Sequence, residues 1–141
     1  MLPVNDVPAA VRAVEALSAS NDARNYTEIN VVPDGVNVFA VTSAGKERAY
    51  LYSGDKLGEP GPETPSEGEP FTLRGIPLEQ AAKVSAYVTK QFKGSIVAQV
   101  ALVVVKPNGL VWAVRSQSGK GGLLNTLFSP DGKIISAVPA N

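Results

Sequence analysis

The stretch PDGVNVFAVTSAGKE, from Pro33 to Glu47, is similar in sequence to PNGLVWAVRSQSGKG, from Pro107 to Gly121. Each copy begins in a turn-forming sequence, continues through an apolar run, and ends at a second turn with a Gly-Lys pair. Self-similarity of this kind outranks other sequence signals in setting the architecture of a chain. We therefore expect a duplicated unit, built around turn-forming and core-forming residues.

Each copy is preceded by a segment with helical spacing of its apolar residues. The first runs from Pro8 to about Ala19, with Val11, Val14 and Leu17 on one stripe. The second runs from Pro77 to about Phe92. Proline suits a first helical turn, because its missing N–H would have no partner there. The sequence thus predicts one helix at the start of each unit.

The strands of each unit are predicted from apolar runs separated by short turns. Short connections make neighbouring strands antiparallel. The predicted fold class is α+β, with two tandem repeats in which a helix covers an antiparallel sheet. The expected strands are 26–32, 36–42 and 47–53 in the first repeat, and 95–105, 110–116, 122–128 and 133–138 in the second.

These elements divide the chain into residues 1–53, a linker at 54–70, and residues 71–141. The linker, GDKLGEPGPETPSEGEP, is rich in glycine, proline and glutamate and has almost no apolar residues. Proline and charge favour an extended, solvated segment. A plain tether is the first interpretation. The alternative is a docking peptide for a partner, since proline-rich segments lose little entropy on binding.

One strand differs from the others. Ile96 to Val105, IVAQVALVVV, is apolar on both faces apart from Gln99. A strand that is covered on one face only should alternate between apolar and polar residues. We expect this strand to lie centrally and to pack within the chain. Its alternative role is a homodimer interface.

The composition excludes several chemistries. The chain has 141 residues, 44% of them hydrophobic and 18% charged, which is typical of a globular protein. Its 13 basic and 13 acidic residues cancel, so it lacks the basic footprint of a nucleic-acid binder. It has no cysteine and no histidine. The commonest nucleophile-base pairs and metal sites are therefore missing, and we predict no cofactor, no metal site and no enzymatic activity.

The sequence gives little information on compartment. No run reaches about 18 apolar residues, so a membrane span is not expected. The start, MLPVNDVPAA, lacks the basic and apolar regions of a signal peptide. The sequence leaves the location open: an extracytoplasmic location is favoured if an export signal preceded Met1 and was removed, and a cytoplasmic one otherwise.

Three sets of residues partly match the motifs of catalytic, phosphate-binding or calcium-binding sites. Ser43 to Lys46 and Ser53 to Lys56 fit S-x-x-K, but both fall in predicted turns without the accompanying motifs. Ser118 to Gly122 contains a Gly-Lys pair but lacks the remaining residues of a phosphate-binding loop. Asp34, Asn108 and Asp131, each followed by glycine, could suggest calcium ligation, but the spaced acidic loop ending in glutamate is absent and such pairs are typical of turns. We interpret all three sets as structural.

The candidate binding residues come from the predicted strand 47–53, whose side chains point alternately to the two faces of the sheet. Arg48, Tyr50 and Tyr52 share one face of this predicted strand, and Leu51 lies on the other. In the repeat alignment Leu51 corresponds to Leu127, so we expect the helix to cover the Leu51 face and these three side chains to be exposed. Tyrosine and arginine are enriched where interfaces concentrate binding energy. An alternative is that the other repeat covers them. Trp112 is predicted to be a core residue.

A helix followed by three antiparallel strands, closing on SPDGKIIS, resembles the PepSY-type domain. The matching residues are the helix from Leu78 to Phe92, the turn Pro107-Asn108-Gly109, and Asp131 to Ile135. A tandem of such units is similar in plan to the beta-lactamase inhibitory proteins. That resemblance implies binding to an enzyme through a concave sheet face bearing aromatic residues. The usual disulfides of the inhibitory family are absent.

The sequence therefore predicts a non-enzymatic module that binds a protein or peptide through an exposed sheet face. The alternatives are an enzyme inhibitor or regulator, and a small-molecule carrier with a cavity between sheet and helices. An enzyme using lysine, serine, tyrosine or carboxylates would require a deep pocket with convergent polar groups.

Overall fold

The computed structural model describes residues 2–17 and 25–139. A short 3-10 helix, η1, precedes the first α-helix. The elements in chain order are η1 (Val4–Asp6), α1 (Val7–Leu17), β1 (Tyr26–Val32), β2 (Gly35–Val41), β3 (Glu47–Ser53), β4 (Lys56–Leu57), α2 (Gln80–Gln91), β5 (Ile96–Val105), β6 (Gly109–Gln117), β7 (Leu123–Phe128) and β8 (Ile134–Pro139).

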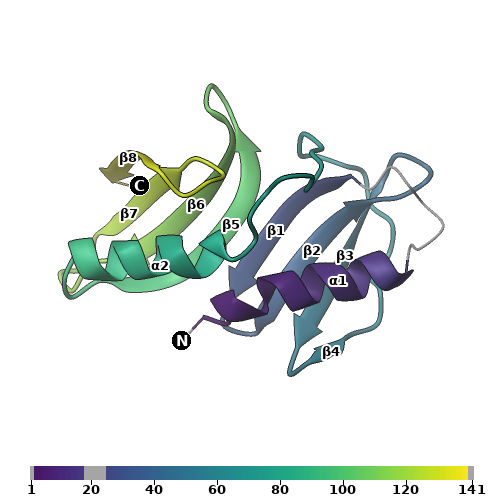
Figure 1. The fold of residues 1–141 in the computed structure, drawn as a ribbon, viewed down its shortest axis with the longest axis horizontal. Helices are drawn as coiled ribbons and strands as arrows, with labels where there is room; N and C mark the ends of the chain where they lie inside the picture. The colour runs from purple at the N-terminus through teal and green to yellow at the C-terminus, as the bar shows by residue number, and fades with distance from the viewer. Residues whose placement is uncertain (1, 18–24, 140–141) are drawn as a thin grey trace.

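All eight of these strands form one antiparallel sheet in the order β4-β3-β2-β1-β5-β6-β7-β8. The sheet is continuous because β1 pairs with β5, joining the strands that follow α1 to those that follow α2. Both helices lie on the same face of the sheet, α1 over β2 and β3 and α2 over β5 and β6 (Figure 1). The α+β class and the antiparallel sheet are as the sequence predicts.

The predicted strands agree with the observed ones to within one residue at each end, and β1 and β3 match completely. Turn-forming residues mark these ends, which explains the agreement. Helix α2 begins at Gln80 rather than Pro77, because residues 78–79 form a turn in which the Gln80 N–H donates to the Pro77 carbonyl oxygen at 3.1 Å. The predicted end of the first helix, near Ala19, lies outside the described residues.

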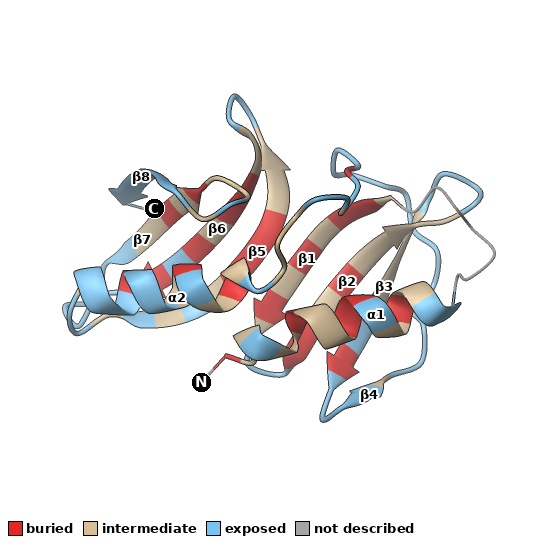
Figure 2. Cartoon of the chain, viewed as in Figure 1, coloured by how far each residue is buried: buried red, intermediate tan, exposed pale blue. Residues whose placement is uncertain are grey.

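The core lies between the helices and the covered face of the sheet, which we define as the face carrying α1 and α2. Val36 and Val38 of β2 and Leu102 of β5 are fully buried there. Trp112 is also fully buried, and its indole N–H donates to the Pro130 carbonyl oxygen at 3.0 Å. The prediction that Trp112 belongs to the core is confirmed. Buried and less buried residues alternate along the strands, as Figure 2 shows.

The opposite face of the sheet, which we call the open face, carries neither helix. Its side chains alternate in sequence with those of the covered face. On β2 it includes Asn37 and Phe39, which are half-buried, whereas Val36 and Val38 are fully buried. The functional interest of the fold centres on this face.

The apolar strand 96–105 lies in the middle of the sheet, between β1 and β6. Its predicted central position is confirmed. Helix α2 covers one of its faces, where Val100 and Leu102 are buried. On its open face Ala101 is 6% exposed and Val103 is half-buried. Packing against α2 therefore explains the apolar residues on the covered face of this strand. The homodimer interface, which stays a prediction, would involve its open face.

The predicted linker follows the edge of the sheet. After β4, Gly58 and Gly61 donate their backbone N–H groups to Leu51 and Ala49 of β3, at 2.8 and 3.0 Å. Thr64 forms an isolated bridge with Glu47, and Phe71 forms one with Tyr26. The segment remains largely exposed, as expected for its composition. Its backbone nevertheless occupies an edge of β3 that would otherwise be unpaired.

Candidate functional site: a groove on the open face

Tyr50 and Tyr52 do not lie on the open face, so the prediction that they are exposed is wrong. They are 9% and 8% exposed and belong to the core beneath α1. Tyr50 pairs with Val38 and Tyr52 with Val36. Residues that are directly opposite in a sheet share a face, so the two tyrosines share the covered face with these buried valines.

The error came from the comparison of Leu51 with Leu127. We expected the leucines to face the helix, but Leu51 is 38% exposed on the open face. The covered face of β7 instead carries Thr126 and Phe128, both fully buried. Side-chain hydropathy alone favoured the leucines as core residues. The position of the helices instead places the tyrosines of β3, and Thr126 and Phe128 of β7, in the core.

Arg48 also makes contacts within the chain. Its Nε donates to the Gly61 carbonyl oxygen at 2.9 Å, and its Nη2 lies 3.3 Å from Glu63 Oε1. Glu63 Oε2 additionally accepts from the Thr42 hydroxyl at 3.0 Å. Arg48 thus links the segment after β4 to the sheet edge, and its role in binding stays a prediction.

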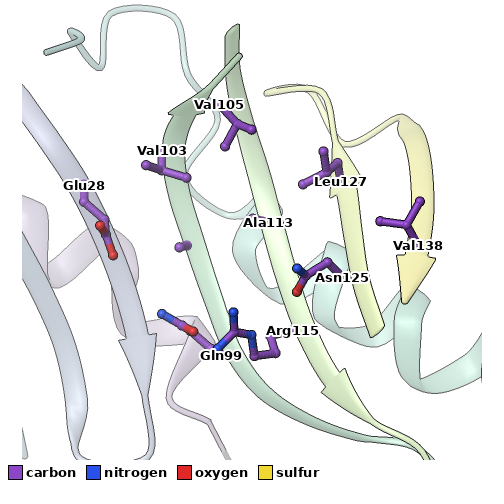
Figure 3. Close-up of a pocket in the computed structure, with 10 residues that line it drawn as sticks. Glu28, Gln99, Val103, Val105, Ala113, Arg115, Asn125, Leu127 and Val138 are labelled. Carbon is purple, nitrogen blue, oxygen red and sulfur yellow. The ribbon is translucent and has the colours of Figure 1, made fainter. Parts of the chain in front are cut away.

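The open face contains a groove of about 330 Å³ that extends over β5, β6, β7 and β8. Figure 3 shows its lining, with Arg115 and Gln99 at one end and Val103 and Val105 at the other. Apolar side chains make up most of the lining. The lining residues are Glu28, Gln99, Ala101, Val103, Val105, Ala113, Arg115, Asn125, Leu127 and Val138.

The groove exists because two small residues are paired at its floor. Ala101 of β5 lies directly opposite Ala113 of β6, and Ala113 lies opposite Leu127 of β7. A methyl side chain rises little above the backbone, so the longer side chains around this pair form the walls. Ala101 is only 6% exposed although neither helix covers it, because these neighbours shield it.

A polar row crosses one end of the groove. Gln99 of β5 lies opposite Arg115 of β6, which in turn lies opposite Asn125 of β7. The Gln99 side-chain amide donates to Asn30 Oδ1 at 2.8 Å and links β5 to β1 on the open face. Arg115 is exposed, and within residues 2–17 and 25–139 it forms no ion pair. Its guanidinium group therefore remains able to bind an anionic ligand.

Glu28 brings a carboxylate to the side of the groove. Burial raises the pKa of this carboxyl group, and repulsion from Glu47 raises it further. The Glu47 carboxylate in turn accepts from the Thr27 hydroxyl at 2.7 Å. No local pattern in the sequence predicts that these two glutamates lie close together. The pairing of β1 with β2 and of β2 with β3 brings them together.

Two of the turns that partly match functional motifs, at Ser118 to Gly122 and at Asp131-Gly132, are stabilised by local hydrogen bonds. Ser118 Oγ accepts the backbone N–H groups of Lys120 and Gly122, at 3.3 and 3.1 Å. The Ser129 hydroxyl donates to the Asp131 carboxylate, and this bond lowers the pKa of Asp131. The structural interpretation of Ser118 to Gly122 and of the Asp131-Gly132 pair agrees with these contacts.

Two further findings concern the described ranges alone. No group of three or more acidic side chains lies close enough to hold a metal ion within residues 2–17 and 25–139. Neither α1 nor α2, the α-helices described for this chain, is long and apolar enough to cross a membrane.

Comparisons with known proteins supply no relative. No family model matches the chain, and no match was found among curated proteins or solved structures. The resemblance to PepSY-type domains and to beta-lactamase inhibitory proteins therefore stays a prediction based on topology.

The groove residues were missed by sequence reasoning because they come from five strands and meet only through strand register. Part of the signal was present in β6. Trp112 and Val114 face the core, so Ala113 and Arg115 must face the opposite side. Once the covered face is known, a small residue two positions before an exposed arginine on the other face indicates the groove.

Proposed function

We propose that this protein is a non-enzymatic module that binds a protein or peptide through the open face of its sheet. The groove over Ala101 and Ala113 carries this proposal. It is largely apolar, with a polar row at one end and Glu28 at its side, the composition expected of a binding site. The helices leave this face uncovered, so a partner can approach it without displacing any helix.

The residue types in the groove favour binding over catalysis. Its ionisable lining residues are Glu28 and Arg115, and the sequence supplies no histidine or cysteine. Arginine stays protonated at all accessible pH values and serves as a fixed cation rather than a general base. Glu28 and Arg115 can therefore orient a ligand by charge.

The order of elements supports a duplication as part of the proposal. A helix followed by three strands occurs first as α1-β1-β2-β3 and again as α2-β5-β6-β7. We propose that these are two similar units whose first strands, β1 and β5, pair at the centre of the sheet. An enzyme inhibitor is the narrower form of this function, and adding the protein to assays of proteases and cell-wall enzymes tests it.

A groove-filling substitution tests the binding function. A random peptide library is selected on the immobilised protein, and the selected peptides are titrated against Ala113→Leu. We expect this variant to bind them at least about tenfold more weakly, because leucine occupies the space above the floor. Ala86→Leu, an exposed position on α2, is the matched control and should bind normally. Equal binding to Ala113→Leu and the unmodified protein would contradict the proposed function.

A further inference from the structure

We propose that the groove binds an extended acidic peptide segment, with an apolar side chain above Ala101 and Ala113 and a carboxylate two residues away on Arg115. This inference rests on the proposed function and specifies the chemistry of the partner. It is carried by the paired alanines, the cation beside them, and the spacing between the two features.

The floor determines where the apolar side chain lies. Ala101 and Ala113 leave a depression that is bounded by Val103, Leu127 and Val138. These walls are hydrocarbon, so an aliphatic side chain that enters the depression loses contact with water without leaving a polar group unpaired. A charged or amide side chain at this point would lose hydration and gain little in return.

Arg115 determines the charge of the ligand. It is the cation among the lining residues, and its two neighbours across the strands, Gln99 and Asn125, have neutral amides. Guanidinium groups bind carboxylates through two parallel hydrogen bonds, which are stronger than bonds between neutral groups. Gln99 is held by Asn30, which fixes one side of this row.

Spacing and orientation follow from the sheet. Ala113 and Arg115 are two residues apart on one strand, which corresponds to roughly 6.6 Å along it. An extended peptide presents its residues i and i+2 to one side at the same spacing. Glu28, beside Ile29 and thus near Val103, puts negative charge at the side away from Arg115. A ligand carboxylate is therefore attracted beside Arg115 and repelled beside Glu28.

The peptide geometry can be tested with short synthetic peptides that have blocked ends and a serine-glycine background. One leucine and one glutamate stand two residues apart, in either order along the chain. Controls replace glutamate by glutamine, or separate the two residues by one or three positions. One of the two orders of leucine and glutamate should bind more tightly than the other. We expect the peptide with that order to bind about tenfold more tightly than its glutamine analogue, the usual effect of a charge-assisted hydrogen bond.

Variants at Arg115 identify the binding group. Arg115→Gln should remove the advantage of glutamate over glutamine, and Arg115→Glu should transfer the preference to peptides with lysine in place of glutamate. Arg115 is exposed, so these changes leave the core intact. Lys83→Gln, which removes an exposed cation from α2, is the matched control and should retain the glutamate preference.

Three outcomes would overturn the inference: equal binding of glutamate and glutamine peptides, no dependence on spacing, or a requirement for a free terminal carboxylate instead of a side chain. Each leaves the proposed function standing if Ala113→Leu still weakens peptides selected from the random library. If Ala113→Leu has no effect on those peptides, the proposed function fails as well. The two failures are thus distinguishable.

Discussion

The covered and open faces of the sheet are made by the same strands but have different chemistry. On β3 the covered face carries Tyr50 and Tyr52, whereas the open face carries Leu51. On β6 the covered face carries Trp112, and the open face carries Ala113 and Arg115. Large rings fill the space under the helices, and small or charged side chains form the groove. The comparison teaches that residue size and position relative to the helices, more than hydropathy, distinguish core from candidate site here.

The largest expected effect tests the assignment of faces on β3. Tyr52→Ala should lower the free energy of unfolding by about 3 kcal/mol, because it leaves a cavity beneath α1. Leu51→Ala, one residue earlier on the open face, should change it by no more than about 1 kcal/mol. Urea unfolding measures both variants. A larger loss for Leu51→Ala than for Tyr52→Ala would reverse the assignment of the faces.

A smaller effect is expected within the covered face itself. The hydroxyl groups of Ser116 and Thr126 are buried there and have no hydrogen-bond partner among residues 2–17 and 25–139. Thr126→Val replaces the hydroxyl by a methyl group of similar size. Because a buried unpaired hydroxyl costs free energy, this variant should be more stable by about 1 kcal/mol.

Thr126→Ser is the matched control for this site. It keeps the hydroxyl and removes the methyl group, so it should be less stable than the unmodified protein. Thermal unfolding of the two variants measures the difference. A destabilised Thr126→Val would show that the hydroxyl has a partner, and the covered face would then contain a polar contact that stabilises the fold.

The smallest effect is expected on the open face, at Glu28, and it depends on pH. The pKa of this carboxyl group is raised in the folded protein, so the folded state holds its proton more tightly than the unfolded state does. Stability from this group is therefore present below the ordinary carboxyl pKa and is lost as pH rises through the folded-state value. Glu28→Gln should be more stable than the unmodified protein at neutral pH.

This advantage of Glu28→Gln should shrink as the pH falls below the ordinary carboxyl range, where both states of the unmodified protein are protonated. Unfolding in urea across acidic and neutral pH measures it. Glu59→Gln, at an exposed glutamate after β4, is the matched control. A stability difference at Glu28 that does not vary with pH would contradict the raised pKa.

The sequence by itself determined most of the elements, although β4 lies within the predicted linker. Turn residues at Pro33-Asp34-Gly35 and Pro107-Asn108-Gly109 fixed where strands end, and proline at positions 8 and 77 indicated two helices. These signals act over a few residues, so they can be read locally. The central place of β5 was also predictable, because ten nearly uninterrupted apolar residues rarely form an edge strand.

The tertiary structure alone decided which face is the core and therefore where the candidate site lies. Alternation along a strand defines two faces but does not say which one the helices cover, and β3 has apolar area on both. The groove depends on contacts across five strands, from Glu28 on β1 to Val138 on β8. Strand order and register bring these residues together, and no local pattern encodes either one.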